Sequence, residues 1–190
     1  MKLKVMKARD YALYSSIIAL GIFLDQLTKW LAVKFLKPID TVPIIKDALH
    51  LTYVENRGAA FGMLADRRYI FMIISTVMIL GLGFYLFAGL LENRLYAISI
   101  SMIISGGIGN MIDRIALGYV VDFIDFRLID FAVFNGADSF VCVGAGLLVL
   151  GLVLDIAKEA RAKKDKEKGN TVNDKSGTGS GKANTGGDEL

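Results

Sequence analysis

The chain has 190 residues, 54% of them hydrophobic and 22% charged, with a formal net charge of +3. This composition is too apolar for an ordinary water-soluble domain and predicts a multi-pass membrane protein with a single main domain. The single cysteine, Cys142, excludes an internal disulfide, and the single histidine, His50, argues against a histidine-based triad or metal site. We therefore expect neither a metal nor a cofactor, and we interpret Cys142 as a small apolar residue packed within a span.

Four apolar segments are close to the ~20 residues that a membrane-spanning helix needs. They cover residues 11–36, 69–91, 95–112 and 137–154. Basic residues lie before the first segment and in 158–168, after the last. Clusters of this kind can bind nucleic acid, but beside membrane spans we interpret them as topology signals and expect no nucleic acid. Both termini are then cytoplasmic, and the segments 37–68 and 113–136 face the opposite side of the membrane.

The two outer segments contain strand-like stretches. Residues 48–61 begin with alternating apolar and polar residues and are interrupted at Gly58, and residues 119–126 are rich in β-formers. We expect the two strands to pair into a small sheet. The sheet must lie at or above the membrane surface, because open sheet edges are not tolerated against lipid. The predicted fold is thus a mainly α four-helix transmembrane domain over 1–157 with a small extracytoplasmic β-sheet. Residues 158–190 form a basic tail that becomes disordered after about Lys168.

Asp25 and Lys29 lie four residues apart in the first span, on one helix face, where they can pair. The pair either braces the bundle or takes part directly in chemistry. Asp113 and Arg114 close the third span, and because adjacent side chains point in different directions, each is expected to find a partner elsewhere. Small residues at four-residue spacing in the third span, ending at Gly109, predict close helix packing.

Asp122 and Asp138 are the residues most indicative of function, because a buried carboxylate near hydrocarbon is costly. Asp138 begins the last span, where a helix N-terminus favours its ionised form. Asp122 lies among aliphatic and aromatic residues, which raise its pKa by desolvation. Opposed environments of this kind suit acid–base catalysis by two carboxylates. The alternatives are that Asp138 only caps the helix, that Asp122 lies on a solvated strand face, or that Asp125 or Asp130 is the reactive group.

Three motifs combine these residues with their neighbours: Gly-Asn-x-x-Asp-Arg at 109–114, Val-Val-Asp-Phe at 120–123 and Phe-Asn-x-Ala-Asp at 134–138. Together with the clusters at 25–29 and 56–62, they resemble lipoprotein signal peptidase, the type II signal peptidase of bacteria. The resemblance covers about residues 11–157. It implies an aspartic endopeptidase without a metal, with four membrane helices and an extracytoplasmic β-cradle.

The resemblance also assigns residues and partners. It implies that Asp122 and Asp138 are catalytic. It implies that the residues that bind substrate or shape the site are Asn56, Gly58, Asn110, Arg114, Asn135 and Ala137, and that the structural polar residues are Asp25, Lys29 and Asp113. The implied substrates are diacylglyceryl prolipoproteins, cut before the lipidated cysteine in the bacterial cytoplasmic membrane, and globomycin-type molecules are the implied inhibitors. We expect the enzyme to contact membrane lipid and to act as a monomer.

Two other classes use the same residues differently. A small ion- or proton-coupled transporter would use Asp25 and Lys29 as a relay, and a membrane scaffold would use the outer loops to bind a partner. Four spans, no internal repeat and polar clusters gathered at one membrane face argue against transport. A scaffold would tolerate asparagine in place of either Asp122 or Asp138.

Overall fold

The computed structural model describes residues 6–58, 68–91 and 93–177. The chain divides into two compact units, Met1–Val149 and Leu150–Leu190. Among the described residues, the helices are α1 (Ala8–Leu31), α2 (Arg68–Phe87), α3 (Arg94–Ala116) and α4 (Gly136–Gly177), and α1 continues into the π-helical turn η1 (Ala32–Leu36). Three stretches are long and apolar enough to cross a membrane: Ala8–Leu36, Arg94–Ala116 and Gly136–Lys164. With the shorter apolar helix Met72–Phe87, they confirm the expected mainly helical membrane fold.

Three helix ends differ from the predicted ones by four residues or more. α2 ends at Phe87, before the predicted end at residue 91. α3 continues to Ala116, so Asp113 and Arg114 lie within the helix, not in the outer segment. The helix can include them because both side chains have polar partners in the bundle. α4 continues to Gly177, through part of the tail that was expected to be disordered. Residues 157–168 are mostly Ala, Lys, Glu and Arg, which are strong helix formers. The rest of the predicted tail, 178–190, lies outside the described residues.

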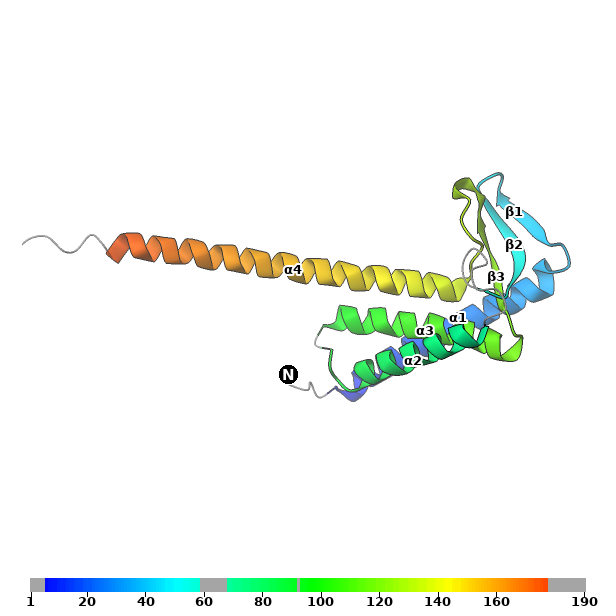
Figure 1. Cartoon of the computed structure of the whole chain (residues 1–190), viewed down its shortest axis with the longest axis horizontal. Helices are drawn as coiled ribbons and strands as arrows, with labels where there is room; N and C mark the ends of the chain where they lie inside the picture. Colours follow the sequence, from blue (N-terminus) through cyan, green and yellow to red (C-terminus); the bar gives the residue numbers. More distant parts are fainter. Residues whose placement is uncertain (1–5, 59–67, 92, 178–190) are drawn as a thin grey trace, which may run out of the picture. The chain divides into compact units, whose positions relative to one another are not determined.

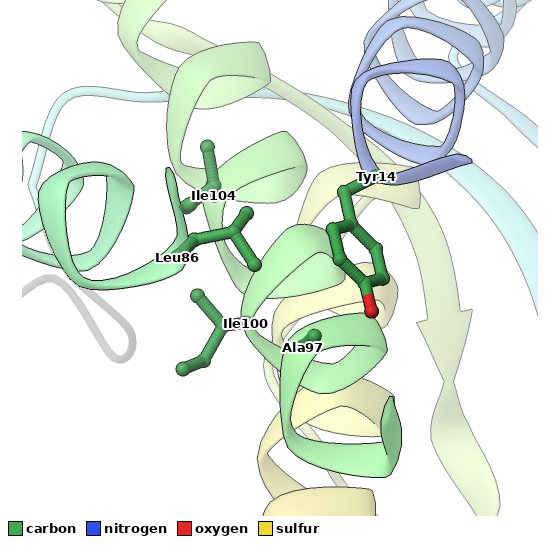
Figure 2. Packing of buried hydrophobic residues seen from close by; sticks show 5 residues of the cluster. All are labelled: Tyr14, Leu86, Ala97, Ile100 and Ile104. Carbon is green, nitrogen blue, oxygen red and sulfur yellow. The ribbon is translucent and has the colours of Figure 1, made fainter. Parts of the chain in front are cut away.

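Within the first unit, α3 packs against both α1 and α2 (Figure 1). Figure 2 shows the contact, where side chains of all three helices meet in one buried cluster. The cluster consists of Tyr14 from α1, Leu86 from α2, and Ala97, Ile100 and Ile104 from α3. Gly144, in the first part of α4, approaches the backbone of α3, since a Cβ there would lie 2.7 Å from the Ser99 carbonyl oxygen. Glycine at position 144 thus allows α4 to pack closely against α3.

The three strands β1 (Thr41–Ile45), β2 (Leu49–Asn56) and β3 (Val120–Phe126) form an antiparallel sheet in the order β1-β2-β3 (Figure 1). The predicted pairing of two strands from different outer segments is confirmed by β2 and β3. β1 was not predicted, because it is short and contains Pro43, which an edge strand tolerates. Val121 of β3 packs with Ala32 and Leu36 of η1. The sheet is therefore anchored at the end of the first span.

Candidate active site

Asp122 lies in the middle of β3 with its side chain only 1% exposed. Its two carboxylate oxygens accept hydrogen bonds from side-chain amides, Oδ2 from Asn56 Nδ2 at 2.9 Å and Oδ1 from Asn135 Nδ2 at 2.6 Å. Burial raises the pKa of Asp122 to about 6; the negative charge of Asp138 acts in the same direction, and the two amides oppose it. Asn56 of β2 can reach Asp122 because the register of the two strands places Asn56 opposite Val120, two residues before Asp122.

Asp138 lies in the first turn of α4, and its carboxylate helps to cap the N-terminus of that helix. The backbone N–H of Asp138 donates to Asn135 Oδ1 at 2.9 Å, and Asp138 Oδ2 accepts from the backbone N–H of Asn135 at 3.3 Å. This reciprocal arrangement is a capping box. The second carboxylate oxygen, Oδ1, accepts from Asn110 Nδ2 at 2.8 Å. The first turn of a helix favours negative charge, so the start of α4 and these hydrogen bonds favour the ionised form of Asp138, whereas its burial opposes that form.

Asn135 connects the two aspartates. Its Oδ1 caps α4 at Asp138, while its Nδ2 donates both to Asp122 Oδ1 and, at 3.0 Å, to Asn110 Oδ1. The side chain is completely buried. Asn135 therefore caps α4 and also contacts the carboxylates of both aspartates.

A buried ionic network lies behind the aspartates and fixes the orientation of Asn110. Lys29 Nζ lies 2.9 Å from Asp25 Oδ2 and 3.1 Å from Asp113 Oδ2, and it donates to Asn110 Oδ1 at 2.9 Å. Because the amide oxygen of Asn110 accepts from Lys29, its Nδ2 is left to donate to Asp138. The expected pairing of Asp25 with Lys29 is confirmed, and Asp113 shares the same ammonium group.

Each carboxylate of this network also holds the backbone of an element that carries a candidate catalytic residue. Asp25 Oδ1 accepts from the backbone N–H of Ala137 at 2.7 Å, at the start of α4. Asp113 Oδ2 accepts from the backbone N–H of Val121 at 3.0 Å, next to Asp122 on β3. The network therefore positions both aspartates from behind. A Cβ at Gly109 would lie 2.5 Å from Asp25 Oδ2, so this approach of α1 to α3 requires glycine.

Gln26 belongs to the network and was not among the predicted site residues. Its Nε2 donates to Asp113 Oδ1 at 3.0 Å, and to Gly109 O and Asp25 Oδ2 at 3.2 Å each. The available signal was a polar amide next to Asp25 within an apolar span. Its role depends on contacts between α1 and α3, which a local pattern does not encode.

A cavity of about 460 Å³ opens onto both aspartates and is called the active-site cavity below. Its lining includes the predicted residues Asn56, Gly58, Asn110 and Arg114, and the guanidinium of Arg114 donates to Asn110 O at 3.3 Å. Ala137 is buried and holds Asp25 instead of lining the cavity. The volume falls within the range of ~300–1,000 Å³ that is typical of sites for small ligands.

The apolar wall of the active-site cavity was not predicted. It comes mainly from residues 131–134, and Ser139 and Cys142 of α4 complete it. The packing expected for Cys142 is wrong, because its side chain is exposed at this wall. Its position follows from helix geometry, since it lies four residues after Asp138 and so on the same face of α4. Ordinary apolar residues carry no sequence signal that separates cavity walls from lipid-facing surfaces.

The two competing carboxylates lie outside the active-site cavity. Burial alone would raise the pKa of Asp125, but hydrogen bonds from Thr52 Oγ1 at 2.7 Å and Arg127 Nε at 2.9 Å keep it below the usual value. Asp130 is exposed and lies in a left-handed turn with φ of 49°. Within the described parts of the chain, no group of three or more His, Cys, Asp or Glu side chains is arranged to hold a metal ion.

The comparisons with known proteins agree with this geometry. The family model described as signal peptidase (SPase) II matches residues 17–154, which is most of the chain. The chain belongs to the signal peptidase II family. Signal peptidase II is an aspartic peptidase of the membrane, and this assignment excludes the transporter and scaffold alternatives.

Curated members of the signal peptidase II family are similar over most of their length. The lipoprotein signal peptidase of Caldanaerobacter subterraneus subsp. tengcongensis is 54% identical over 138 residues, which are 73% of this chain and 92% of that protein. The lipoprotein signal peptidase of Halothermothrix orenii is 48% identical over 136 residues, 72% of this chain and 92% of that protein. A solved structure described as a bacterial membrane enzyme has a TM-score of 0.72 at 32% identity and covers 77% of this chain and 91% of its own.

Proposed function

We propose that this signal peptidase II removes the signal peptide from diacylglyceryl-modified prolipoproteins, with Asp122 and Asp138 as the catalytic pair. The names of its relatives support the reaction, which is the removal of signal peptides from prolipoproteins. One observation carries the assignment of the residues: Asp122 and Asp138 line the same cavity, and the amide and backbone of a single buried residue, Asn135, contact both. No other carboxylate among the described residues lines that cavity.

The surroundings favour one placement of the shared proton. Asp122 carries it, because burial and the charge of Asp138 raise the pKa of Asp122 to about 6. In this placement Asp138 is the ionised partner, which the first turn of α4 favours and two hydrogen bonds support. The pair titrates as a unit, so this placement describes the favoured form of the dyad.

The reaction then proceeds in two proton-balanced steps. Asp138 removes a proton from water, the water oxygen adds to the scissile carbonyl carbon, and Asp122 gives its proton to the carbonyl oxygen. The product of this step is a tetrahedral gem-diol. As the C–N bond breaks, Asp138 gives its proton to the leaving nitrogen and Asp122 takes a proton from one hydroxyl, which restores the starting dyad.

The remaining predicted residues hold or receive the reacting groups. Asn56, Asn110 and Asn135 position the two carboxylates through their amides. Gly58 and Arg114 line the active-site cavity, where Arg114 supplies hydrogen-bond donors for substrate oxygen atoms. The buried Asp25, Lys29 and Asp113, together with Ala137, act from behind the dyad as structural residues.

The distribution of basic residues supports a reaction at the extracytoplasmic face. The basic residues before the first span and after the last support cytoplasmic termini. The sheet and both aspartates then lie at the outer surface, where the diacylglyceryl chains stay in lipid while the peptide bond reaches the active-site cavity. Globomycin-type inhibitors would occupy the same cavity, and the monomer contains every residue that the proposed reaction uses.

The test is cleavage of a lipidated precursor by the full chain in membranes. Asp122→Asn and Asp138→Asn are each expected to abolish turnover, whereas the matched changes Asp125→Asn and Asp130→Asn leave it largely intact. Near-normal turnover by either dyad variant would contradict the catalytic assignment. Loss of turnover in Asp125→Asn alone would identify Asp125 as the catalytic residue instead. Comparison with an unlipidated precursor tests the requirement for the diacylglyceryl group.

A further inference from the structure

A second cavity, of about 400 Å³, lies between the end of the first span and the sheet, and is called the sheet groove below. Its lining comes from α1, η1 and all three strands. It includes Thr28, Phe35, Leu36, Val42, Leu51 and Phe123. Phe123 directly follows Asp122 on β3, so the groove faces the side of the strand away from the catalytic dyad. The only polar residue of the lining, Thr28, already donates its hydroxyl to carbonyl oxygens of its own helix.

The π-helical turn η1 gives the sheet groove a buried floor and an open rim. Lys37 N donates to Ala32 O at 2.9 Å, the i→i+5 bond that defines this turn. Ala32 and Leu36 are each only 6% exposed and pack against the sheet. Phe35, between them, remains 59% exposed at the wall of the groove. The groove is therefore accessible at the end of a membrane-spanning segment.

A cation lies at this rim. Lys34 Nζ is 5.1 Å from the ring centroid of Phe35, which lines the sheet groove, and 4.8 Å from the ring centroid of Trp30. No ion pair joins Lys34 to an acidic side chain in the described segments. Tryptophan and lysine at the end of a span are typical of the level where hydrocarbon meets lipid headgroups. The sheet groove thus offers an apolar slot next to a positive charge at the depth of phosphate groups.

We propose that the sheet groove binds one acyl chain of an anionic glycerophospholipid from the surrounding bilayer, with the lipid phosphate at Lys34. The occupant is a bilayer lipid because the diacylglyceryl group of the proposed substrate carries no phosphate for Lys34 to pair with. The active-site cavity also lies on the other face of β3. A bound chain contacts Val42, Leu51 and Phe123, one residue from each strand, and so holds the sheet against the membrane.

The test uses a fluorescent reporter in the wall of the groove. Trp30 is the only tryptophan of the chain, so the double variant Trp30→Phe/Phe35→Trp places the single indole at the groove. The matched control, Trp30→Phe/Val77→Trp, places it on α2 at a position that is 65% exposed and outside the groove lining. Each full-length protein in detergent is titrated with phosphatidylglycerol or phosphatidylcholine brominated on the acyl chains, which quenches nearby tryptophan.

Brominated phosphatidylglycerol is expected to quench the groove reporter saturably, at a lipid fraction several-fold below that needed for the control. Phosphatidylcholine should require more lipid, and adding Lys34→Gln to the groove reporter should abolish this preference. Parallel quenching of both reporters would overturn the proposal, since it describes ordinary surrounding lipid. Relief of quenching by an equal amount of a phosphate-free diacylglyceryl peptide would also overturn it, because the groove would then hold the substrate lipid.

Discussion

The change Asn56→Ala tests the placement of the shared proton on Asp122. Asn56 Nδ2 donates to Asp122 Oδ2 at 2.9 Å, and this bond stabilises the ionised carboxylate. A hydrogen bond to a charged group contributes roughly 1.5–3 kcal/mol, which corresponds to about 1–2 pKa units at 1.36 kcal/mol per unit. Water that enters the vacated space offsets part of this loss, so we expect an upward shift of about 1 unit from the present value near 6.

The assay is the pH dependence of kcat for cleavage of a lipidated precursor. Ionisation of the proton-carrying aspartate ends activity on the alkaline side, so Asn56→Ala should move the alkaline limb to higher pH even where it lowers the maximal rate. Thr52→Val is the matched control: it lies on the same strand but its hydroxyl contacts Asp125, so the limb should stay in place. An alkaline limb that stays or moves to lower pH in Asn56→Ala would show that Asp122 does not carry the proton.

Three further predictions concern the buried polar residues. Lys29→Met leaves two buried carboxylates without their cation and should cost roughly 3–5 kcal/mol, seen as a lower melting temperature in detergent. Gly109→Ala forces a Cβ against Asp25, so it should lower the free energy of unfolding by about 1–3 kcal/mol and also reduce turnover. In the control Gly81→Ala on α2, the new Cβ meets nothing within 4 Å, so the change should be neutral or slightly stabilising. The folded chain binds the Asp122 proton more tightly than the unfolded chain does, with a pKa of about 6 against 3.8, so stability should fall by about 2 kcal/mol as pH rises from 4 to 6. Melting curves of Asp122→Asn should lack this slope, and an unchanged slope would contradict the assignment.

The sequence was most informative where a signal is local or where a motif is long. Continuous apolar segments predicted four helices because a membrane span needs a fixed length of hydrocarbon-compatible residues. β2 and β3 were predicted from their composition, and the expected place of their sheet at the membrane surface came from the requirement that an open edge avoid lipid. The candidate dyad came from motifs that place Asp122 on a strand and Asp138 at a helix start, and both placements are confirmed.

What the sequence did not predict depends on contacts between distant segments. Gln26 reaches Asp113 only because α1 and α3 pack together. Cys142 faces the active-site cavity because contacts with Asp25 and Asn110 orient the first turns of α4. The hydrophobic periodicity of α4 gives no information about these contacts. The strand β1 is too short and too interrupted by Pro43 to stand out from a turn. These features are set by tertiary packing, which overrides local preference.

The pairing of Asp25 with Lys29 within a single helix has a consequence for the biogenesis of the enzyme. The two charges lie one turn apart, so the first span can enter the bilayer already neutralised, before its partners have been synthesised. Asp113 joins the same ammonium group only when α3 arrives, and Ala137 brings the start of α4 to Asp25 last of all. Under the proposed mechanism, a nascent chain would therefore lack Asp138, and with it proteolytic activity, until the last span has been inserted.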